Sequence, residues 1–409
     1  MTSEAAALRP SRGKGVVITA LGVTQILAWG SSYYLLAVLA GPIAADTGWP
    51  LSLVVGALSL GVVVAGLASP KIGRLIQDRG GRPVLMGSAV LIAAGQGVLA
   101  VSPDVLVYGI GWLLLGLGMG AGLYDAAFAT LGRLYGLGGR HAITTMTLFG
   151  GFASTVCWPL SAFLVDQLGW RGACATYAAA QVLLAFPIYA FVLPRETAVA
   201  RPAVDRQGSR DPRQSSRDAR AVGLLFVAVA TSITISSVIS ATLSVHLLTI
   251  LQSRGLELGA AVALGALVGP CQVGARAIEM GLSRFHHPIW TKVASVACVL
   301  AGVLGLALDI PMVAIALVFY GAGIGLESIA RGTVPLALFG PDRYAELMGR
   351  IAFPSLVAQA IAPTIAAIGL QRTGPDETLI AIVVLALVNC AIVALVFLSY
   401  RSLRSRSQP

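Results

Sequence analysis

Long apolar runs separated by short polar breaks dominate this chain of 409 residues. About twelve of them reach roughly 20 residues, the length that a helix needs to cross a bilayer. They lie near residues 16–40, 51–72, 84–101, 105–132, 142–165, 171–193, 222–251, 259–282, 289–308, 312–333, 346–369 and 378–400. The runs are continuous rather than alternating, so they predict helices and not the strands of a membrane barrel. We therefore expect an all-α polytopic membrane protein.

One polar segment is much longer than the other breaks. Residues 194–221 contain arginines, serines and aspartates but little that is apolar, which favours a solvated linker. The linker would divide the chain into two bundles of six helices. The predicted parts are a tail at 1–15, a bundle at 16–193, the linker at 194–221, a bundle at 222–400 and a tail at 401–409.

Alternate glycines mark the fourth run, over residues 114–130. Gly116 and Gly120 are four residues apart, as are Gly118 and Gly122, so each pair makes a flat stripe on one helix face. Such stripes let a neighbouring backbone approach closely in a membrane. Asp125 follows them and cannot face lipid at a tolerable cost. We expect it to face other helices or water.

The tenth run resembles the fourth. Gly120 aligns with Gly323, the sequence after each glycine contains an acid and ends on alanine and threonine, and at the same offset Arg140 aligns with Arg343. A repeat of about half the chain suggests two copies of one unit, as in transporters built from parallel repeats. We expect two halves related by a pseudo-two-fold axis along the membrane normal.

Composition agrees with a membrane protein, since 56% of the residues are hydrophobic and only 11% are charged. A soluble domain carries about 25% charged residues. The net charge of +10 does not indicate nucleic acid, because the basic residues, with Lys292 among them, lie in alternate breaks between runs. This pattern places both termini in the cytoplasm of a multi-pass cell-membrane protein, such as one of a bacterial inner membrane. Only four basic residues fall outside it: Arg171, Arg254, Arg276 and Arg372.

Signals for enzymes and cofactors are missing from the sequence. It has no nucleotide-binding glycine loop and no nucleophile elbow, and its five cysteines lie in apolar runs without metal-ligand spacing. We expect no cofactor, no metal site and no enzymatic activity. The expected partners are the lipid bilayer, a small-molecule substrate and a coupling ion, with the chain acting as a monomer.

Few ionisable residues lie inside the predicted spans, and each is a functional hypothesis by default. They are Asp125, His246, Arg276, Glu279, Glu327, Arg331 and, near the edge of a span, Arg350. Arg276 and Glu279 are three residues apart, and Glu327 and Arg331 are four apart, so each pair can meet on one helix face. Each pair could neutralise itself and stabilise the bundle, or its arginine could contact substrate. Asp125 has no cation at these spacings.

A basic motif closes the second run at residues 73–85. It resembles the signature of the major facilitator superfamily between helices two and three, because Gly73, Leu75, Gly80 and Arg82 match in register. Gln77 stands where that family has an acid. The gating residues that the resemblance implies are Gly73, Arg74, Gln77, Asp78, Gly80 and Arg82, and Glu279 is a further gate candidate. The resemblance implies twelve helices, alternating access and a ligand site between the halves.

A second likeness involves the eighth run, at residues 269–276. It is similar to the monocarboxylate-porter branch, in which an aspartate and an arginine four residues apart serve proton and substrate carboxylate. Arg276 matches that arginine, but Gln272 replaces the aspartate. If a proton is carried, the resemblance leaves it to another acid.

The leading functional hypothesis is secondary active transport of a small organic anion, coupled to an ion or to protons. The candidate substrate residues are Arg276, Arg331, Tyr33, Tyr34 and Gln272. The alternative is efflux of a toxic compound, either drug-like or a thiol-seeking metalloid such as arsenite. Cys157 and Cys271 would bind the metalloid if spans five and eight are neighbours.

Three residues are candidates for proton coupling. Asp125 is the first because a lone acid can change its proton affinity as a cavity opens and closes; a structural hydrogen bond to a neighbouring helix is the alternative. Glu327 is the second, although Arg331 one turn away would keep it ionised. His246 is a possible relay, but a packed histidine is the more common situation.

Overall fold

The computed structural model describes residues 13–195, 212–308 and 313–406. The helices of the first part are α1 (Lys14–Gly30), α2 (Leu36–Thr47), α3 (Leu51–Arg79), α4 (Gly81–Ala100), α5 (Val105–Gly122), α6 (Tyr124–Tyr135), η1 (Gly136–Gly138), α7 (Gly139–Gly151), α8 (Ala153–Ala180), the π-helical turn η2 (Gln181–Ala185) and α9 (Phe186–Val192). Those that follow are α10 (Pro212–Ser253), α11 (Leu258–Gly265), α12 (Val268–Leu282), η3 (Ser283–Phe285), α13 (Pro288–Ala307), α14 (Val313–Phe339), α15 (Tyr344–Arg372) and α16 (Pro375–Arg406). Of the predicted linker 194–221, residues 196–211 lie outside the described residues.

Nine continuous helical stretches in the described part of the chain are long and apolar enough to span a membrane. One of them, Val105–Val192, has 88 residues. At about 1.5 Å per residue it would be roughly four times as long as a bilayer core is thick. It therefore crosses more than once, turning at Gly136–Gly138 and at Gly169, where φ is +70°. The predicted first span is made of two shorter helices, α1 and α2.

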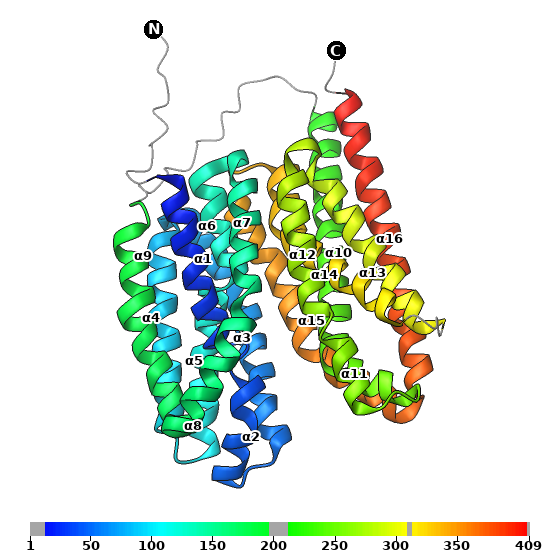
Figure 1. The fold of residues 1–409 in the computed structure, drawn as a ribbon. Helices are drawn as coiled ribbons and strands as arrows, with labels where there is room; N and C mark the ends of the chain where they lie inside the picture. Colours follow the sequence, from blue (N-terminus) through cyan, green and yellow to red (C-terminus); the bar gives the residue numbers. More distant parts are fainter. Residues whose placement is uncertain (1–12, 196–211, 309–312, 407–409) are drawn as a thin grey trace.

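The helices form two groups that lie side by side (Figure 1), α1–α9 and α10–α16. We call the end of the bundle where α1 begins, α3 ends and α15 begins the basic end. The groups meet mainly in the half nearer that end: Gly73 packs on Ala345 and Gly349, and Gly132 packs on the ring of Tyr344. α3 and α15 also remain in contact further in, as far as Val62 and Ala360.

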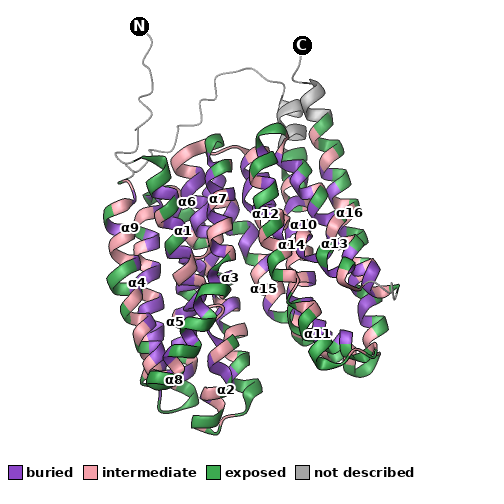
Figure 2. Cartoon of the chain, in the orientation of Figure 1, coloured by how far each residue is buried: buried purple, intermediate pink, exposed green. Residues whose placement is uncertain are grey.

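The outward faces of the bundle are apolar. Figure 2 shows exposed residues along the outer sides of both groups, and many of them are large hydrophobic residues. Leu106, Leu183, Phe191 and Leu224 are each at least 70% exposed. So much exposed apolar surface is foreign to a soluble monomer and fits a lipid environment.

The glycine stripes of α5 pack as the sequence predicts. A side chain on Gly116 or Gly120 would meet the backbone of α3, and one on Gly118 or Gly122 would meet Ile92 or Ser88 on α4. The two stripes therefore hold α5 against two neighbours at backbone contact.

The packing corrects the predicted register of the repeat. Gly325 on α14 packs on Gln272 of α12, as Gly120 packs on α3, whereas Gly323 packs on α13. α3 belongs to the second span of its group and α12 to the second span of the other group, so Gly120 corresponds to Gly325 rather than to Gly323. The letters alone could not distinguish the two registers because both alignments match glycine with glycine.

A small cluster fixes the turn at Gly169. Trp170 Nε1 donates to Asp46 Oδ2 at 2.9 Å, and the Arg171 guanidinium bonds the same oxygen. These two hydrogen bonds, with Trp170 contributing most, hold the pKa of the exposed Asp46 carboxyl below its ordinary value. The Gly-Trp-Arg sequence therefore joins the end of α2 to the second half of α8.

The glycine stripe makes a testable prediction on stability. Gly116→Ala should destabilise the protein by about 1–3 kcal/mol, because the new methyl group would overlap the carbonyl oxygen of Gly61. The matched control is Gly109→Ala on the same helix, where no atom lies within 4 Å of the added carbon. Thermal unfolding of the purified variants in detergent measures both. Equal melting temperatures for the two variants would contradict the packing account.

Candidate functional site

Helix breaks occur in several spans, and glutamines stabilise two of them. Gln25 donates to the carbonyl of Gly122 at 2.6 Å, where α5 gives way to α6. Gln96 donates to the carbonyl of Ser31, between α1 and α2. A broken helix inside a membrane needs such partners for its freed backbone groups, and broken helices commonly surround transport sites.

Aromatic side chains gather beside these breaks. Trp29 lies at the end of α1, with ring centroids 5.3 Å from Tyr33, 5.7 Å from Tyr34 and 4.9 Å from Tyr124. Trp158 of α8 joins the cluster through Tyr34 at 6.2 Å. We call these five residues the aromatic cluster. Thus the structure groups the predicted Tyr33 and Tyr34 with three aromatic residues that sequence reasoning had not assigned to a site.

Arg276 of α12 approaches the aromatic cluster from the other group of helices. It is buried, donates to Thr147 O at 3.1 Å and reaches Gln272 Oε1 at 3.4 Å. Its charge interacts electrostatically with the hydroxyls of Tyr34 and Tyr124. The predicted meeting of Arg276 with Glu279 is wrong, because Glu279 points to other partners.

The positive charge of Arg276 is not neutralised by the described chain. Its hydrogen-bond acceptors are a carbonyl and an amide oxygen, and its Nε is buried without a partner. Across the described residues, no carboxylate lies within 4.0 Å of its guanidinium nitrogens. An unpaired buried cation is costly, and it leaves Arg276 able to receive an anion.

Asp125 lies in the first turn of α6, directly after the break at Leu123. Arg331 of α14 binds it with two hydrogen bonds, Nε to Oδ1 at 2.7 Å and Nη2 to Oδ2 at 2.8 Å. This bidentate ion pair joins the two groups of helices. The prediction of a lone acid is therefore wrong: the same-helix spacings lacked a cation, but the opposite group supplies one.

Glu327 also has a partner from outside its own helix. Lys292 Nζ lies 2.6 Å from Glu327 Oε1, and Ser295 donates to Oε2 at 2.9 Å. The prediction that Arg331 pairs with Glu327 is wrong in this conformation. So is the assignment of Lys292 to a break between spans, because its side chain is only 5% exposed inside α13.

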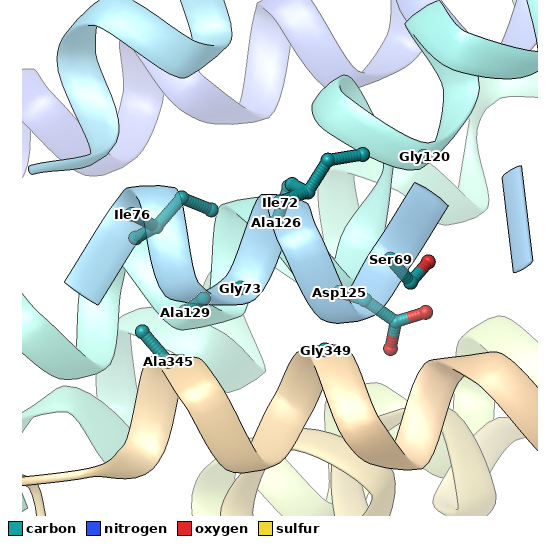
Figure 3. A pocket seen from close by; sticks show the side chains of 10 residues that line it. All are labelled: Ser69, Ile72, Gly73, Ile76, Gly120, Asp125, Ala126, Ala129, Ala345 and Gly349. Carbon is teal, nitrogen blue, oxygen red and sulfur yellow. The ribbon is translucent and has the colours of Figure 1, made fainter. Parts of the chain in front are cut away.

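A small pocket lies beside Asp125, between α3, α6 and α15 (Figure 3). It encloses about 190 Å³ of space not filled by atoms, including its open mouth. Its lining consists of Ser69, Ile72, Gly73, Ile76, Gly120, Asp125, Ala126, Ala129, Ala345 and Gly349. Asp125 is the one acidic residue in this lining of small and apolar residues, and the space beside it is about large enough for a single water molecule.

Glu279 contributes to a second polar link between the groups, at the basic end. It accepts from Thr291 at 2.7 Å, lies 3.5 Å from Arg140 of α7 and 3.3 Å from the ring of His286. The Arg140 guanidinium also donates to the carbonyl of His286. Arg140 and His286 were not identified as site residues from the sequence, since neither lies three or four residues from Glu279.

The residues of the predicted gating motif are at the end of α3 and the start of α4. Gln77, in the acid position of the motif, donates to Asp342 O across the groups at 2.8 Å. Its own carbonyl accepts from Arg133, and Arg82 donates to the carbonyl of Ala190. Of the remaining motif residues, Arg74 and Asp78 are exposed, Gly73 contacts α15, and Gly80 makes the turn with φ +87°.

The other candidates are dispersed. His246 Nε2 lies 2.8 Å from Pro363 O, which links α10 to α15. Cys157 packs on Gly30 of α1, whereas Cys271 packs on Gly321 of α14. The two thiols thus have different neighbours.

Arg350 is half-exposed and forms its ion pair with Glu346 at 2.6 Å.

Lys292 is the main residue that sequence reasoning missed. One signal could have revealed it: Pro288 is a typical first residue of a helix, so Lys292 lies one turn inside α13. The tyrosine and tryptophan partners carried no such signal, because aromatic residues are ordinary packing material in membrane spans.

Comparison with known sequences identifies one family. The family model described as Major Facilitator Superfamily matches residues 21–325. Monocarboxylate transporter 11 of Mus musculus is 35% identical over 136 residues, covering 32% of this chain and 28% of that protein. The Homo sapiens protein of the same name is 34% identical over 157 residues, covering 37% and 30%. The chain thus matches less than a third of the length of these curated relatives.

Solved structures share the fold across nearly the whole chain. The human organic anion transporter MFSD10 (TETRAN) superposes with a TM-score of 0.72 at 18% identity, covering 94% of this chain and all of that one. FucP in the outward conformation gives 0.70 at 15%, covering 93% and 98%, and the proton:xylose symporter XylE gives 0.70 at 12%, covering 92% and 94%. These similarities confirm the predicted fold class.

The ion pair between the groups predicts a strong energetic coupling. Asp125→Asn and Arg331→Met should each lower the free energy of unfolding by about 3–5 kcal/mol, because each leaves one charge unpaired. The double variant should lose much less than the sum. Chemical or thermal unfolding in detergent gives the coupling energy.

The control for this cycle is Arg343, whose side chain is 65% exposed and lies 3.0 Å from Glu346. Replacing Arg343 by a neutral residue should change stability by about 1 kcal/mol or less. Additive losses for Asp125 and Arg331 would show that their contact contributes nothing.

Proposed function

Since this chain belongs to the Major Facilitator Superfamily, we propose that it is a secondary active transporter that moves a small organic anion by alternating access. Members of this family are multi-pass membrane transporters rather than enzymes. The proposal concerns the substrate class, the coupling and the residues that serve them.

The observation that carries the proposal is the unneutralised charge of Arg276. A small carboxylate bound beside this guanidinium, on the side of the aromatic cluster, could accept two hydrogen bonds from the planar donor. The aromatic rings of Trp29, Tyr33 and Tyr34 would then contact the apolar part of the substrate. Gln272, Tyr124 and Thr147 would orient the arginine and the anion.

The comparisons support the same substrate class without assigning it. The curated relatives are called monocarboxylate transporters, and one structural relative is called an organic anion transporter. The first resemblance covers about a third of this chain, and the second is one of fold. The substrate class therefore rests mainly on Arg276.

We place the basic end in the cytoplasm, in accordance with the positive-inside rule. The contacts of α3 with α15 and of Arg140 with Glu279 would then close the cytoplasmic side. The structure would correspond to an outward-facing state, like the state named for FucP. Substrate would reach Arg276 from outside the cell.

Proton coupling is assigned to Asp125. Its ion pair with Arg331 joins the groups, so a proton that neutralises Asp125 would weaken that contact. The pocket beside it offers room for water to deliver the proton. Glu327 is held by Lys292 and His246 by a backbone carbonyl, which makes them weaker candidates as primary carriers.

Substrate binding can be tested without knowing the natural substrate. Short monocarboxylates should raise the melting temperature of the purified protein, whereas the corresponding amides should not, because only an anion neutralises Arg276. Arg276→Gln should weaken the response at least about 10-fold in Kd, or about 1.4 kcal/mol. The measurement is a thermal-shift titration.

The control variant is Arg350→Gln, which removes an exposed arginine from α15. It should respond to carboxylates like the wild type. If Arg276→Gln also responds like the wild type, or if only dyes or trivalent arsenic stabilise the protein, the anion proposal is wrong. Loss of the arsenic response in a Cys157→Ser, Cys271→Ser variant would favour metalloid efflux.

Coupling makes a prediction on flux. In proteoliposomes, Asp125→Asn should abolish accumulation of a carboxylate in response to a pH gradient, because asparagine has the shape and charge of the protonated acid. Binding measured by thermal shift should persist. Accumulation at a normal rate by Asp125→Asn would rule out Asp125 as the carrier.

A further inference from the structure

Four charges of alternating sign run from one group of helices into the other. Asp125 of α6 pairs with Arg331 of α14, and Lys292 of α13 pairs with Glu327 of α14. Arg331 and Glu327 lie four residues apart on the same helix, so they are neighbours on one face. The charge of Arg331 interacts electrostatically with those of both Glu327 and Lys292.

We propose that Lys292 and Glu327 are positioning residues for the coupling step. Glu327 is the second partner of Arg331, and Lys292 holds Glu327 away from that role while Asp125 is ionised. When Asp125 takes up a proton from the pocket, Arg331 loses its counter-charge and turns to Glu327. The ion pair between the groups is then replaced by one inside the second group, and the basic end can open. This inference rests on the proposed proton coupling at Asp125.

The surrounding groups suit such an exchange. The remaining hydrogen bonds of Arg331 go to the hydroxyls of Ser237 at 3.3 Å and Ser355 at 2.8 Å. Hydroxyls can rotate and find other partners, so releasing the guanidinium leaves no second buried charge unpaired. The exchange moves an arginine between two acids of similar burial, since the side chains of Asp125 and Glu327 are both 15% exposed.

Lys292 also has neutral partners that can hold it during the exchange. Its ammonium lies 3.4 Å from Ser236, whose hydroxyl accepts from Asn389 at 2.9 Å. Asn389 in turn accepts from Ser232 at 2.6 Å. This series of hydroxyl and amide groups extends over α10 and α16. It would provide hydrogen-bond partners for the Lys292 ammonium when Glu327 turns toward Arg331.

Two further titratable groups face these charges. The phenol of Tyr344 on α15 interacts with Asp125, and the thiol of Cys390 on α16 interacts with Lys292. Ser69 of α3 faces Asp125 across the pocket and carries no charge (Figure 3). The phenol and the thiol are both neutral groups. The alternation of signs therefore depends on the two acids and the two cations.

The exchange predicts opposite effects for the two residues of one ion pair. Lys292→Met frees Glu327 to compete for Arg331, so the two groups of helices should part at higher pH. Glu327→Gln removes the competitor and leaves Lys292 to repel Arg331, so the groups should part only at lower pH. We call the pH at which half of the molecules have an open basic end the midpoint. If the ion pair merely stabilises the fold, both variants should be less stable but should keep the midpoint of the wild type.

The experiment measures opening of the basic end without any substrate. Spin labels at Leu137→Cys and Phe285→Cys sit on exposed positions of η1 and η3, one in each group. Distances between them are measured by electron double resonance over a pH series, with the chain lacking introduced cysteines as the labelling blank. We expect the midpoint to rise by about one pH unit in Lys292→Met and to fall by about one unit in Glu327→Gln.

Two further variants complete the test. Lys292→Met, Glu327→Gln keeps the pair neutral and should fold even if a single variant does not, and its midpoint should also lie below that of the wild type. Arg350→Met is the control for an exposed ion pair and should leave the midpoint unchanged. Unchanged midpoints in all the Lys292 and Glu327 variants that fold would overturn this inference alone. A wild type that shows no pH-dependent opening would overturn the coupling proposal itself, whatever the thermal-shift result for the anion.

Discussion

A charge inside a membrane protein must be paired, and this constraint organises the middle of the bundle. Asp125 and Glu327 each receive a cation, from Arg331 and Lys292 respectively. Arg276 has only neutral acceptors among the described residues. The arrangement thus leaves one positive charge beside the aromatic cluster. An anionic substrate would complete the pairing, and the same constraint would make its binding and release depend on the state of the other charges.

The helix breaks make this arrangement possible. An uninterrupted α5–α6 helix would carry Asp125 in another direction, and the break at Leu123 is stable because Gln25 binds the freed carbonyl of Gly122. The glycine stripes contribute indirectly, since backbone contact between α5, α3 and α4 fixes the helix from which the break starts. Glycines and a helix break, which would weaken a helix of a soluble protein, therefore help to position a charge in this membrane protein.

The sequence predicted the membrane class, the positions of the spans and the glycine stripes, because hydropathy and four-residue spacing are properties of single helices. It failed for the ion pairs. Spacing rules identify partners only within one helix, whereas the partner of Asp125 lies 206 residues away along the chain. It also misassigned Lys292, since a lysine close to the end of an apolar run resembles a loop residue. The register of the repeat needed the packing partner of Gly325, which the letters do not contain.

The central claim is that Arg276 holds the anion, and the most direct measurement is a structure of the protein with a brominated short-chain carboxylate. Anomalous scattering would locate the bromine independently of the protein density. The account predicts a bromine peak within the aromatic cluster and the carboxylate within hydrogen-bond distance of Arg276. A carboxylate bound away from Arg276, or an acidic side chain of the protein turned onto Arg276 in its place, would contradict it.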